Sequence, residues 1–170
     1  MGRRGVELSG VDVNKLIELL NKALSEEWLA YYQYWIGARV MEGPMRSEIE
    51  PELLLHATQE LNHATLVVNR IIQLGGTPVL NPADWMKLGE CKYEAPVDPY
   101  IEVVLDQNLN GERCAIERYK NLADFTNGKD HVTHQMATTI LNEEMEHEQD
   151  IEDWILDIER MKENFKKLHM

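Results

Sequence analysis

Two short motifs in this sequence could do metal chemistry, because each places a carboxylate and an imidazole three residues apart. Residues three apart lie on the same face of an α-helix, so both side chains of a motif can reach one ion. A single glutamate precedes each motif, 33 residues before the first and 32 before the second. Two such motifs and two such glutamates are the ligand set of a carboxylate-bridged two-metal site in a four-helix bundle. The six residues are Glu27, Glu60, His63, Glu112, Glu144 and His147.

The charges of this set balance those of two divalent ions. Four glutamates carry −4 and two divalent ions carry +4, so the charges cancel if both histidines are neutral. Burying carboxylates without such compensation costs free energy. We expect Glu60 and Glu144 to bridge the ions, while Glu27 and Glu112 bind one ion each. Oxygen-rich ligation with two imidazoles suits iron or manganese, and zinc can compete. Two ferrous ions held there could deliver two electrons together to peroxide or dioxygen.

Four long helices must position these residues, and the apolar pattern predicts them. Apolar side chains recur at alternating steps of three and four in four segments, which is typical of one buried helical face. The predicted helices begin near Asp12, between Ser47 and Pro51, near Asp98–Pro99 and near Asp130. The first three end at Gly43–Pro44, Gly75–Gly76 and Asn127–Gly128. We expect residues 1–10 to be a flexible lead-in and residues 160–170 to be a tail that frays or caps the last helix.

The segment 75–98 is rich in glycine and proline and predicts a long crossover, with one short helical turn after Asn81–Pro82. Such a crossover makes the second and third helices parallel. The halves also share the pattern Glu-x-x-Ala-x-x-x-Tyr, at residues 27–34 and 112–119, which suggests a pseudo-twofold axis. We therefore predict an all-α fold, a single domain over residues 1–170 with the bundle at about 12–158.

Composition restricts the partners. The net charge of −13 disfavours nucleic acid and anionic lipid, and favours cations. No apolar run approaches the roughly 20 residues that span a bilayer, and the first residues lack the apolar run of a secretory signal. We expect a soluble, cytoplasmic protein without membrane contact.

Some residues near the motifs have two interpretations. The hydroxyls of Tyr34 and Tyr119 could hold the glutamate of the partner helix, or both could be ordinary core tyrosines. His56 lies one turn before Glu60 and is more typical of a polar core residue than of a ligand. We expect His131, His134 and His169 to lie on the surface, and Glu143, Glu146 and Glu148 to form a solvated acidic face.

Two cysteines are too few for a disulfide scaffold. Cys114 lies two residues after Glu112 and therefore points away from the metal ligands. The crossover that carries Cys91 could pass beside it, giving a disulfide or dithiol near the site. Two unrelated buried thiols are the other interpretation.

The ligand motif resembles that of the ferritin-like superfamily over residues 12–158, and the six-residue set resembles a bacterioferritin-type ferroxidase centre. The added cysteine pair is similar to that of the Dps-like thioferritins. This resemblance implies two iron ions per subunit and a hollow dodecameric shell that oxidises ferrous iron with hydrogen peroxide or dioxygen and stores the ferric product, protecting against oxidative stress.

The sequence departs from these families at two places. Leu61 stands where bacterioferritin has the methionine that binds haem, so no haem is expected. Arg3 and Arg4 are the basic residues near the N-terminus, where many Dps proteins carry a lysine-rich arm, so no DNA binding is expected.

Two other functions remain alternatives. One is a non-storing di-metal peroxidase or catalase of rubrerythrin or manganese-catalase type, and the other is a bundle without chemistry.

Overall fold

Each of the four long helices begins at a local signal in the sequence. In the computed structural model, which describes residues 3–169, these helices are α2 (Val13–Val40), α3 (Arg46–Gln73), α5 (Ile101–Thr126) and α6 (His131–Leu168). The Asp12 carboxylate accepts hydrogen bonds from the backbone N–H groups of Asn14 and Lys15, and the Asp130 carboxylate accepts one from Thr133. These caps satisfy N–H groups that have no partner within the helix. The predicted starts at Asp12 and Asp130 are confirmed.

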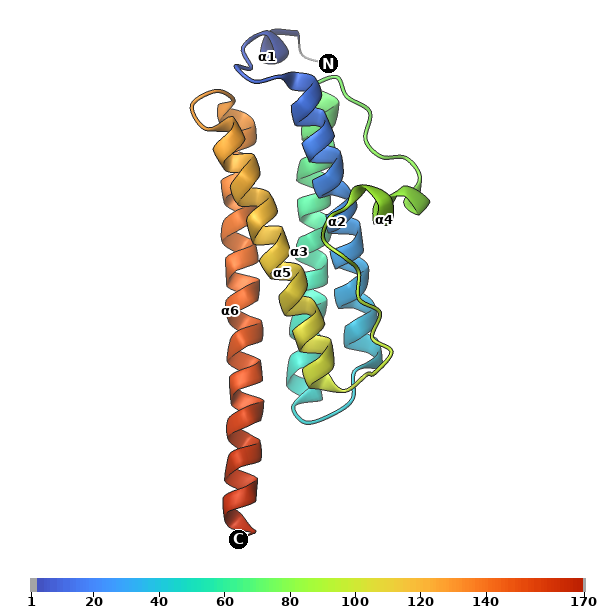
Figure 1. Ribbon diagram of the computed structural model, residues 1–170, viewed down its shortest axis with the longest axis vertical. Helices are drawn as coiled ribbons and strands as arrows, with labels where there is room; N and C mark the ends of the chain where they lie inside the picture. Colours follow the sequence, from blue (N-terminus) through green and yellow to red (C-terminus); the bar gives the residue numbers. More distant parts are fainter. Residues whose placement is uncertain (1–2, 170) are drawn as a thin grey trace.

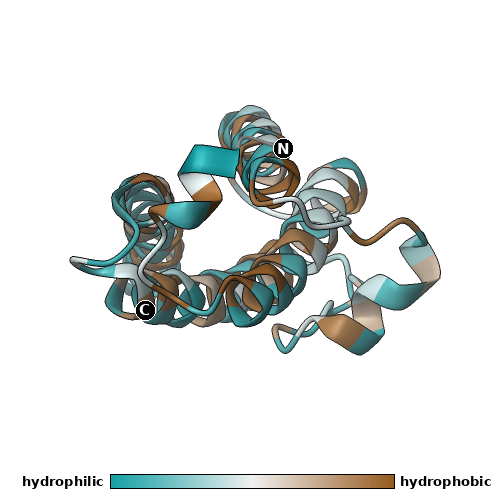
Figure 2. Cartoon of the chain, turned by 90° about the horizontal axis from the view of Figure 1, so that it is seen from above, coloured by the Kyte–Doolittle hydropathy of each residue, from teal (hydrophilic) through white to brown (hydrophobic). Residues whose placement is uncertain are grey.

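The helices form two antiparallel hairpins joined by a long crossover (Figure 1). The first hairpin is α2 and α3, and the second is α5 and α6. The crossover descends along the outside of the first hairpin, so α3 and α5 run in the same direction, as predicted (Figure 1). It contains the short helices η1 (Pro82–Asp84) and α4 (Trp85–Leu88), and it lies to one side of the four long helices when these are seen from above (Figure 2). The all-α bundle with a long crossover is thereby confirmed.

Both ends of the chain, predicted as a flexible lead-in and a tail that frays or caps the last helix, contain helix where the structure describes them. Residues Arg3–Glu7 form the short helix α1, and α6 continues as an exposed helix to Leu168 instead of fraying after residue 160. Lys166 and Lys167 lie in the last turn of α6, where positive charge favours the helix dipole. The helix α2 ends at Val40, shortly before the predicted Gly43–Pro44 stop.

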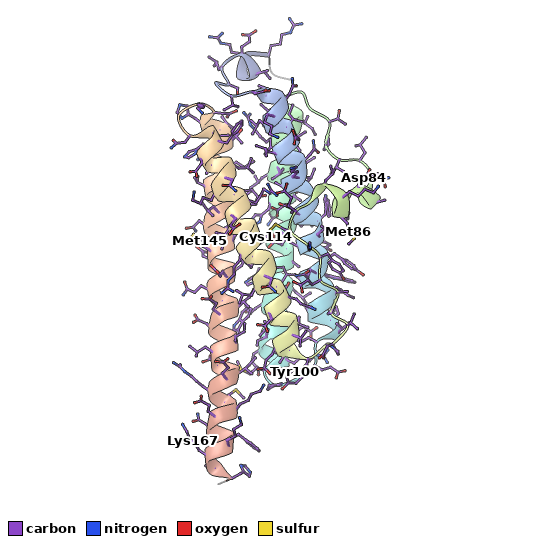
Figure 3. All side chains as sticks on the ribbon, viewed as in Figure 1. Asp84, Met86, Tyr100, Cys114, Met145 and Lys167 are labelled. Carbon is purple, nitrogen blue, oxygen red and sulfur yellow. A yellow bond between two sulfur atoms is a disulfide. The ribbon has the colours of Figure 1, made fainter. Side chains whose placement is uncertain are left out.

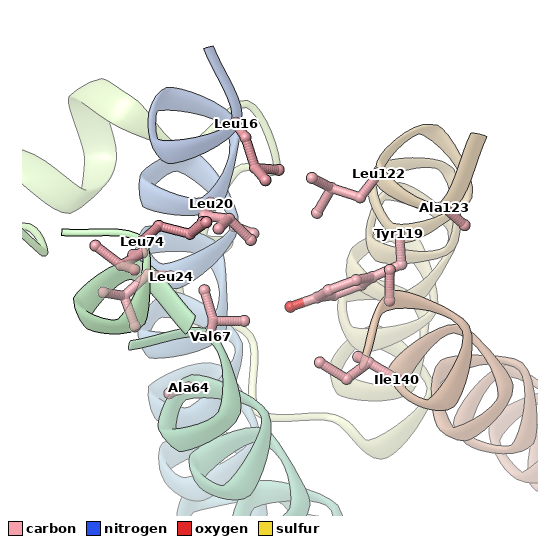
Figure 4. Packing of buried hydrophobic residues seen from close by; sticks show 13 residues of the cluster. Leu16, Leu20, Leu24, Ala64, Val67, Leu74, Tyr119, Leu122, Ala123 and Ile140 are labelled. Atoms are coloured by element: carbon pink, nitrogen blue, oxygen red, sulfur yellow. The ribbon is translucent and has the colours of Figure 1, made fainter. Parts of the chain in front are cut away.

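Apolar side chains gather in two clusters along the bundle. One cluster contains residues of all four helices, and the Tyr119 ring projects within it from α5 toward the α2–α3 hairpin (Figure 4). The other lies nearer the loop between α2 and α3. The first includes Leu16, Leu20, Val67, Leu122 and Ile140, and the second includes Ile49, Leu53, Leu105, Ile151 and Ile158. The six motif residues lie on the same helix faces between these clusters, so a polar layer interrupts the apolar core.

The two hairpins meet less extensively than the helices within each hairpin. Most contacts of α2 are with α3 and most contacts of α5 are with α6, while the α2–α5 and α3–α6 contacts are fewer. The polar layer therefore lies where the two hairpins join. Among the described residues, no helix has the length and apolar character needed to cross a membrane.

Candidate metal centre

The six motif residues converge in two overlapping groups at the centre of the bundle. The first group is Glu27, Glu60, His63 and Glu144, and the second is Glu60, Glu112, Glu144 and His147. In each group every residue offers one ligand atom that lies within 4.8 Å of the others. Glu60 and Glu144 belong to both groups, one from each hairpin. This arrangement is compatible with a two-metal site in which these two carboxylates are shared.

The atoms that point into this cluster have no hydrogen-bond partner within residues 3–169. Oxygen atoms of all four glutamates and the Nδ1 atoms of both histidines are buried without a hydrogen-bond partner. His63 Nδ1 lies 3.2 Å from Glu144 Oε1 and 3.4 Å from Glu27 Oε2, but neither contact has hydrogen-bond geometry. Buried polar atoms without partners are rare in native proteins. The donor set therefore fits two cations, which would satisfy these atoms together.

Without cations the cluster must hold protons. Burial raises the pKa of Glu27 and of Glu112 well above the usual value, because the charged form loses its solvation. Burial alone would lower the pKa of His147, but Glu112, Glu144 and Glu60 around its ring outweigh this effect and raise the pKa to about 12. The metal-free site thus keeps imidazolium and neutral carboxyl groups, and a bound cation would displace their protons.

Each predicted tyrosine bonds to a glutamate of the other hairpin. The Tyr34 hydroxyl of α2 donates to Glu112 Oε1 of α5, and the Tyr119 hydroxyl of α5 donates to Glu27 Oε1 of α2. Both hydroxyl groups are deeply buried, and burial together with the adjacent carboxylate raises the pKa of each. Of the two interpretations of these tyrosines, this geometry agrees with the one in which each hydroxyl holds a glutamate of the partner helix.

The outer nitrogens of the two histidines also have partners. His63 Nε2 lies 2.8 Å from Glu143 Oε2, and His147 Nε2 lies 3.1 Å from Gln59 Oε1. The prediction that Glu143 belongs to a solvated acidic face is therefore wrong, because α6 turns this side chain over His63. Gln59 was not expected to take part, although its place directly before Glu60 matches that of Glu143 before Glu144.

His56 is buried beside the cluster without joining it. Its ring stacks on His147 at 4.1 Å, and its Nε2 lies 3.3 Å from Asp150 Oδ2. Burial and the neighbouring His147 lower the pKa of His56 to about 3, so the ring is neutral. His131 and His169 are exposed as expected, whereas His134 is half-buried and contacts the Ala123 carbonyl oxygen.

A pocket leads from the crossover to the cluster. Its lining includes Glu27, Glu60, Glu112 and Glu144 from the cluster and Cys91 from the crossover. Cys91 forms a disulfide with Cys114 of α5, which lies at mid-height of the bundle (Figure 3). The structure thus has the disulfide rather than two unrelated thiols.

Other contacts fix this part of the crossover. Glu26 Oε1 accepts hydrogen bonds from the backbone N–H groups of Glu90 and Cys91, and the Glu26 carboxylate pairs with Arg118 of α5. Trp28 stacks on Trp85 of α4 at 5.4 Å, so it packs the crossover onto α2. The wall of the pocket nearest the disulfide is therefore held by α2 and α5 together.

Comparison with known proteins agrees with this geometry. The chain matches the family described as ferritin-like domain over residues 17–161. It is 39% identical over 150 residues to the DNA protection during starvation protein of Pyrococcus furiosus, covering 86% of this chain and 80% of that protein. The structure of the dodecameric thioferritin, a bacterioferritin-related protein of Bacteroides fragilis, superposes with a TM-score of 0.95 at 51% identity, covering 96% of this chain and 99% of that one. Rhodobacter capsulatus bacterioferritin superposes with a TM-score of 0.71 at 26% identity, covering 88% and 89%. A buried cluster of four glutamates and two histidines within a matching four-helix bundle places this chain in the ferritin-like family.

Proposed function

We propose that this protein is a ferroxidase that oxidises ferrous iron with hydrogen peroxide inside each subunit and stores the ferric product in a hollow shell of twelve chains. Two Fe²⁺ ions, one H₂O₂ and two protons give two Fe³⁺ ions and two water molecules. The observation that carries the proposal is the complete set of six ligands within one chain, with their inward atoms buried and unpartnered.

The chain's own residues have definite tasks in this proposal. Glu60 and Glu144, which belong to both ligand groups, would link the two hairpins when ions are bound. Glu27 and Glu112 would each serve one ion, and each is held by a tyrosine hydroxyl. A site that holds two ferrous ions supplies both electrons that peroxide needs, so no one-electron oxygen product is released. The pocket beside the disulfide gives a small oxidant a path to the cluster.

The dodecamer is inferred from similarity. The Bacteroides fragilis thioferritin is dodecameric and superposes over nearly the whole chain. The net charge of −13 supports attraction of ferrous iron and disfavours DNA binding. Leu61 at the position after Glu60 supports a shell without haem.

Iron loading tests the proposal. Metal-free protein receives excess Fe²⁺ without oxygen, peroxide is then titrated in, and the product is analysed by size exclusion with light scattering and metal analysis. Many iron atoms per chain on a particle of about 236 kDa, twelve chains of 19.7 kDa, are expected. About two iron atoms per chain on a small oligomer that still consumes peroxide would instead identify a non-storing peroxidase, and neither iron nor peroxide loss would leave only the bundle.

A further inference from the structure

The hydrogen bonds on the outer histidine nitrogens break the symmetry of the two halves. His63 of α3 bonds to Glu143 of α6 at 2.8 Å, and His147 of α6 bonds to Gln59 of α3 at 3.1 Å. Glu143 and Gln59 each directly precede the glutamate of a motif, so they occupy equivalent positions in the two hairpins. One partner is a carboxylate and the other is a neutral amide.

The geometry fixes which ring nitrogen carries the proton. An ionised carboxylate only accepts hydrogen bonds, so Nε2 of His63 is the donor to Glu143. Its Nδ1 faces Glu27, Glu60 and Glu144, and once the proton on this atom is displaced its lone pair is available for a cation.

The same logic applies to the other half of the site. Nδ1 of His147 faces Glu60, Glu112 and Glu144. A cation on this Nδ1 requires hydrogen on Nε2, and the Gln59 amide therefore presents its oxygen to the ring. The two histidines thus offer the same ligand atom and differ in the acceptor behind it.

This difference changes the donor strength of the two rings. Hydrogen bonds to an ionised acceptor are about twice as strong as those between neutral groups. A carboxylate behind a histidine also makes the metal-facing nitrogen more basic, and loss of such a partner typically weakens metal binding 10–100-fold. The Glu143 side chain is 36% exposed, so water screens part of its charge, but its direct bond to the His63 ring is kept.

We propose that Glu143 and Gln59 make the two metal positions unequal. The position beside His63 takes a divalent cation first and holds it more tightly, while the position beside His147 is weaker and exchanges more readily with incoming ions. Glu143 and Gln59 are positioning residues, because they act through the histidines. This inference deepens the proposed function and rests on its two-metal site.

The test uses Co²⁺ as a redox-inert probe on the whole metal-free protein. Calorimetry and the cobalt absorption spectrum give the two binding steps, and crystals with one equivalent of Co²⁺ show by anomalous scattering which position fills first. The variants are Glu143→Gln, Gln59→Glu and the double exchange, all of which keep side-chain size and a hydrogen-bond acceptor. We expect two steps at least about tenfold apart in the natural protein, with the His63 position filled first. Glu143→Gln should bring the steps together, and the double exchange should reverse the order of filling.

The control removes the same charge from the same helix without touching a histidine. Glu146 is exposed and accepts a hydrogen bond from Asn142, so Glu146→Gln should leave the order and the ratio of the steps unchanged. An equal effect of Glu146→Gln and Glu143→Gln would assign the difference to general charge and overturn the inference. Two equal steps in the natural protein, or an unchanged order in the double exchange, would overturn it as well. Failure to bind Co²⁺ at all would overturn the proposed two-metal site together with this inference.

Discussion

At the scale of single residues, the centre depends on groups that hold ligands in place. Tyr34 and Tyr119 form a crossed pair, because each hydroxyl comes from the hairpin opposite to the glutamate that it holds. Without its tyrosine, Glu27 or Glu112 would have to be oriented by the cation alone. The tyrosines therefore prepare the site before a cation arrives, which reduces the entropy lost on binding.

We predict that Tyr119→Phe weakens binding of the cation served by Glu27 by about 10-fold or more, since partners behind ligands typically contribute this much. Anaerobic calorimetry with Co²⁺ measures the effect. Tyr31→Phe is the matched control, because Tyr31 packs edge-on against Trp28 at 6.1 Å and makes no such bond to a ligand. Equal affinities in Tyr119→Phe and the natural protein would show that the hydroxyl only fills space.

The ligands themselves were predictable from the sequence, but the groups behind them were only partly so. Glutamate and histidine on an apolar helix face stand out because burial of unpaired charge is so unfavourable. Glu143 and Gln59 lie at the edge of that face, where the helical period alone cannot separate a solvated side chain from one that bends over a neighbouring ring. Rotamers decide between these outcomes, and sequence spacing does not specify them.

At the scale of elements, a buried ion pair joins α3 to the start of α6. Arg70 donates to both Asp130 oxygens at 3.0 and 2.8 Å, while Asp130 also caps α6 by accepting from the Thr133 N–H at 3.0 Å. Ser9 of the N-terminal segment bonds to the same carboxylate. The sequence predicted α6 to begin near Asp130. The pairing of Asp130 with Arg70 joins residues 60 apart and is apparent only when the hairpins are packed together.

Asp130→Asn should lower the free energy of unfolding by about 3 kcal/mol or more, because it leaves the buried guanidinium of Arg70 without its counter-ion. Burial would raise the pKa of Asp130, but the hydrogen bonds from Thr133 and Arg70 outweigh this and lower it. A lowered folded pKa contributes stability that is present above the unfolded value of about 3.9 and is lost as pH falls through the folded pKa. The natural protein should therefore lose part of this contribution in acid, and the variant should not.

Urea unfolding at fixed protein concentration, at pH 7 and at pH 3, measures both effects. Asp124→Asn is the control, because Asp124 pairs with Lys120 in an exposed i,i+4 bridge that contributes less than about 1 kcal/mol. An Asp130→Asn variant no less stable than Asp124→Asn would contradict the assignment.

The crossover is the other element whose place was only partly predictable. Its glycines and prolines marked it as a non-helical connection, but the register that brings Cys91 beside Cys114 depends on the Glu26 carboxylate, which binds the crossover backbone. Glu26 is a charged residue next to the ligand candidate Glu27, and no spacing in the sequence distinguishes it from the exposed acidic residues.

We expect the double variant Cys91→Ala/Cys114→Ala to have a free energy of unfolding about 3 kcal/mol lower than that of the oxidised protein. The reason is that the disulfide joins residues 23 apart and so restricts the unfolded chain. Urea unfolding of the oxidised, the reduced and the double-variant proteins measures this. The reduced natural protein should resemble the variant. Equal stability of all three would mean that the bond does not restrict the unfolded chain.

At the scale of the whole molecule, the site joins two hairpins that otherwise contact each other less than their own helices do. The shared carboxylates Glu60 and Glu144 come from different hairpins, so a pair of cations would link them. Without cations, four glutamates and two histidines face one another between the two apolar clusters, and protons must take up the missing positive charge. The same cluster that would do the chemistry therefore also controls how firmly the halves are held together.

This arrangement predicts that stability in the absence of metal falls with rising pH. The folded pKa of His147 is about 12, above the unfolded value of about 6.5, so its contribution is complete below pH 6.5 and declines steadily as pH rises toward 12. The raised pKa values of Glu27 and Glu112 act in the same direction, because the folded state again binds more protons than the unfolded state. A cation on Nδ1 takes the place of the proton there. Protons compete less with the cation as pH rises, so the cation binds more tightly.

Thermal unfolding with a chelator and with two equivalents of Co²⁺ per chain, at pH 6.5 and pH 8.5, measures this coupling. The melting temperature of the metal-free protein should be lower at pH 8.5, and Co²⁺ should raise it more at pH 8.5 than at pH 6.5. Each ion that binds the folded chain alone adds about 2.7 kcal/mol to the free energy of unfolding when its free concentration is 100 times its dissociation constant. Glu60→Gln is the matched variant, because it removes one shared carboxylate and should lose most of the Co²⁺ effect while keeping the fold. A Co²⁺ effect that is equal at both pH values would show that the cations do not replace protons in this cluster.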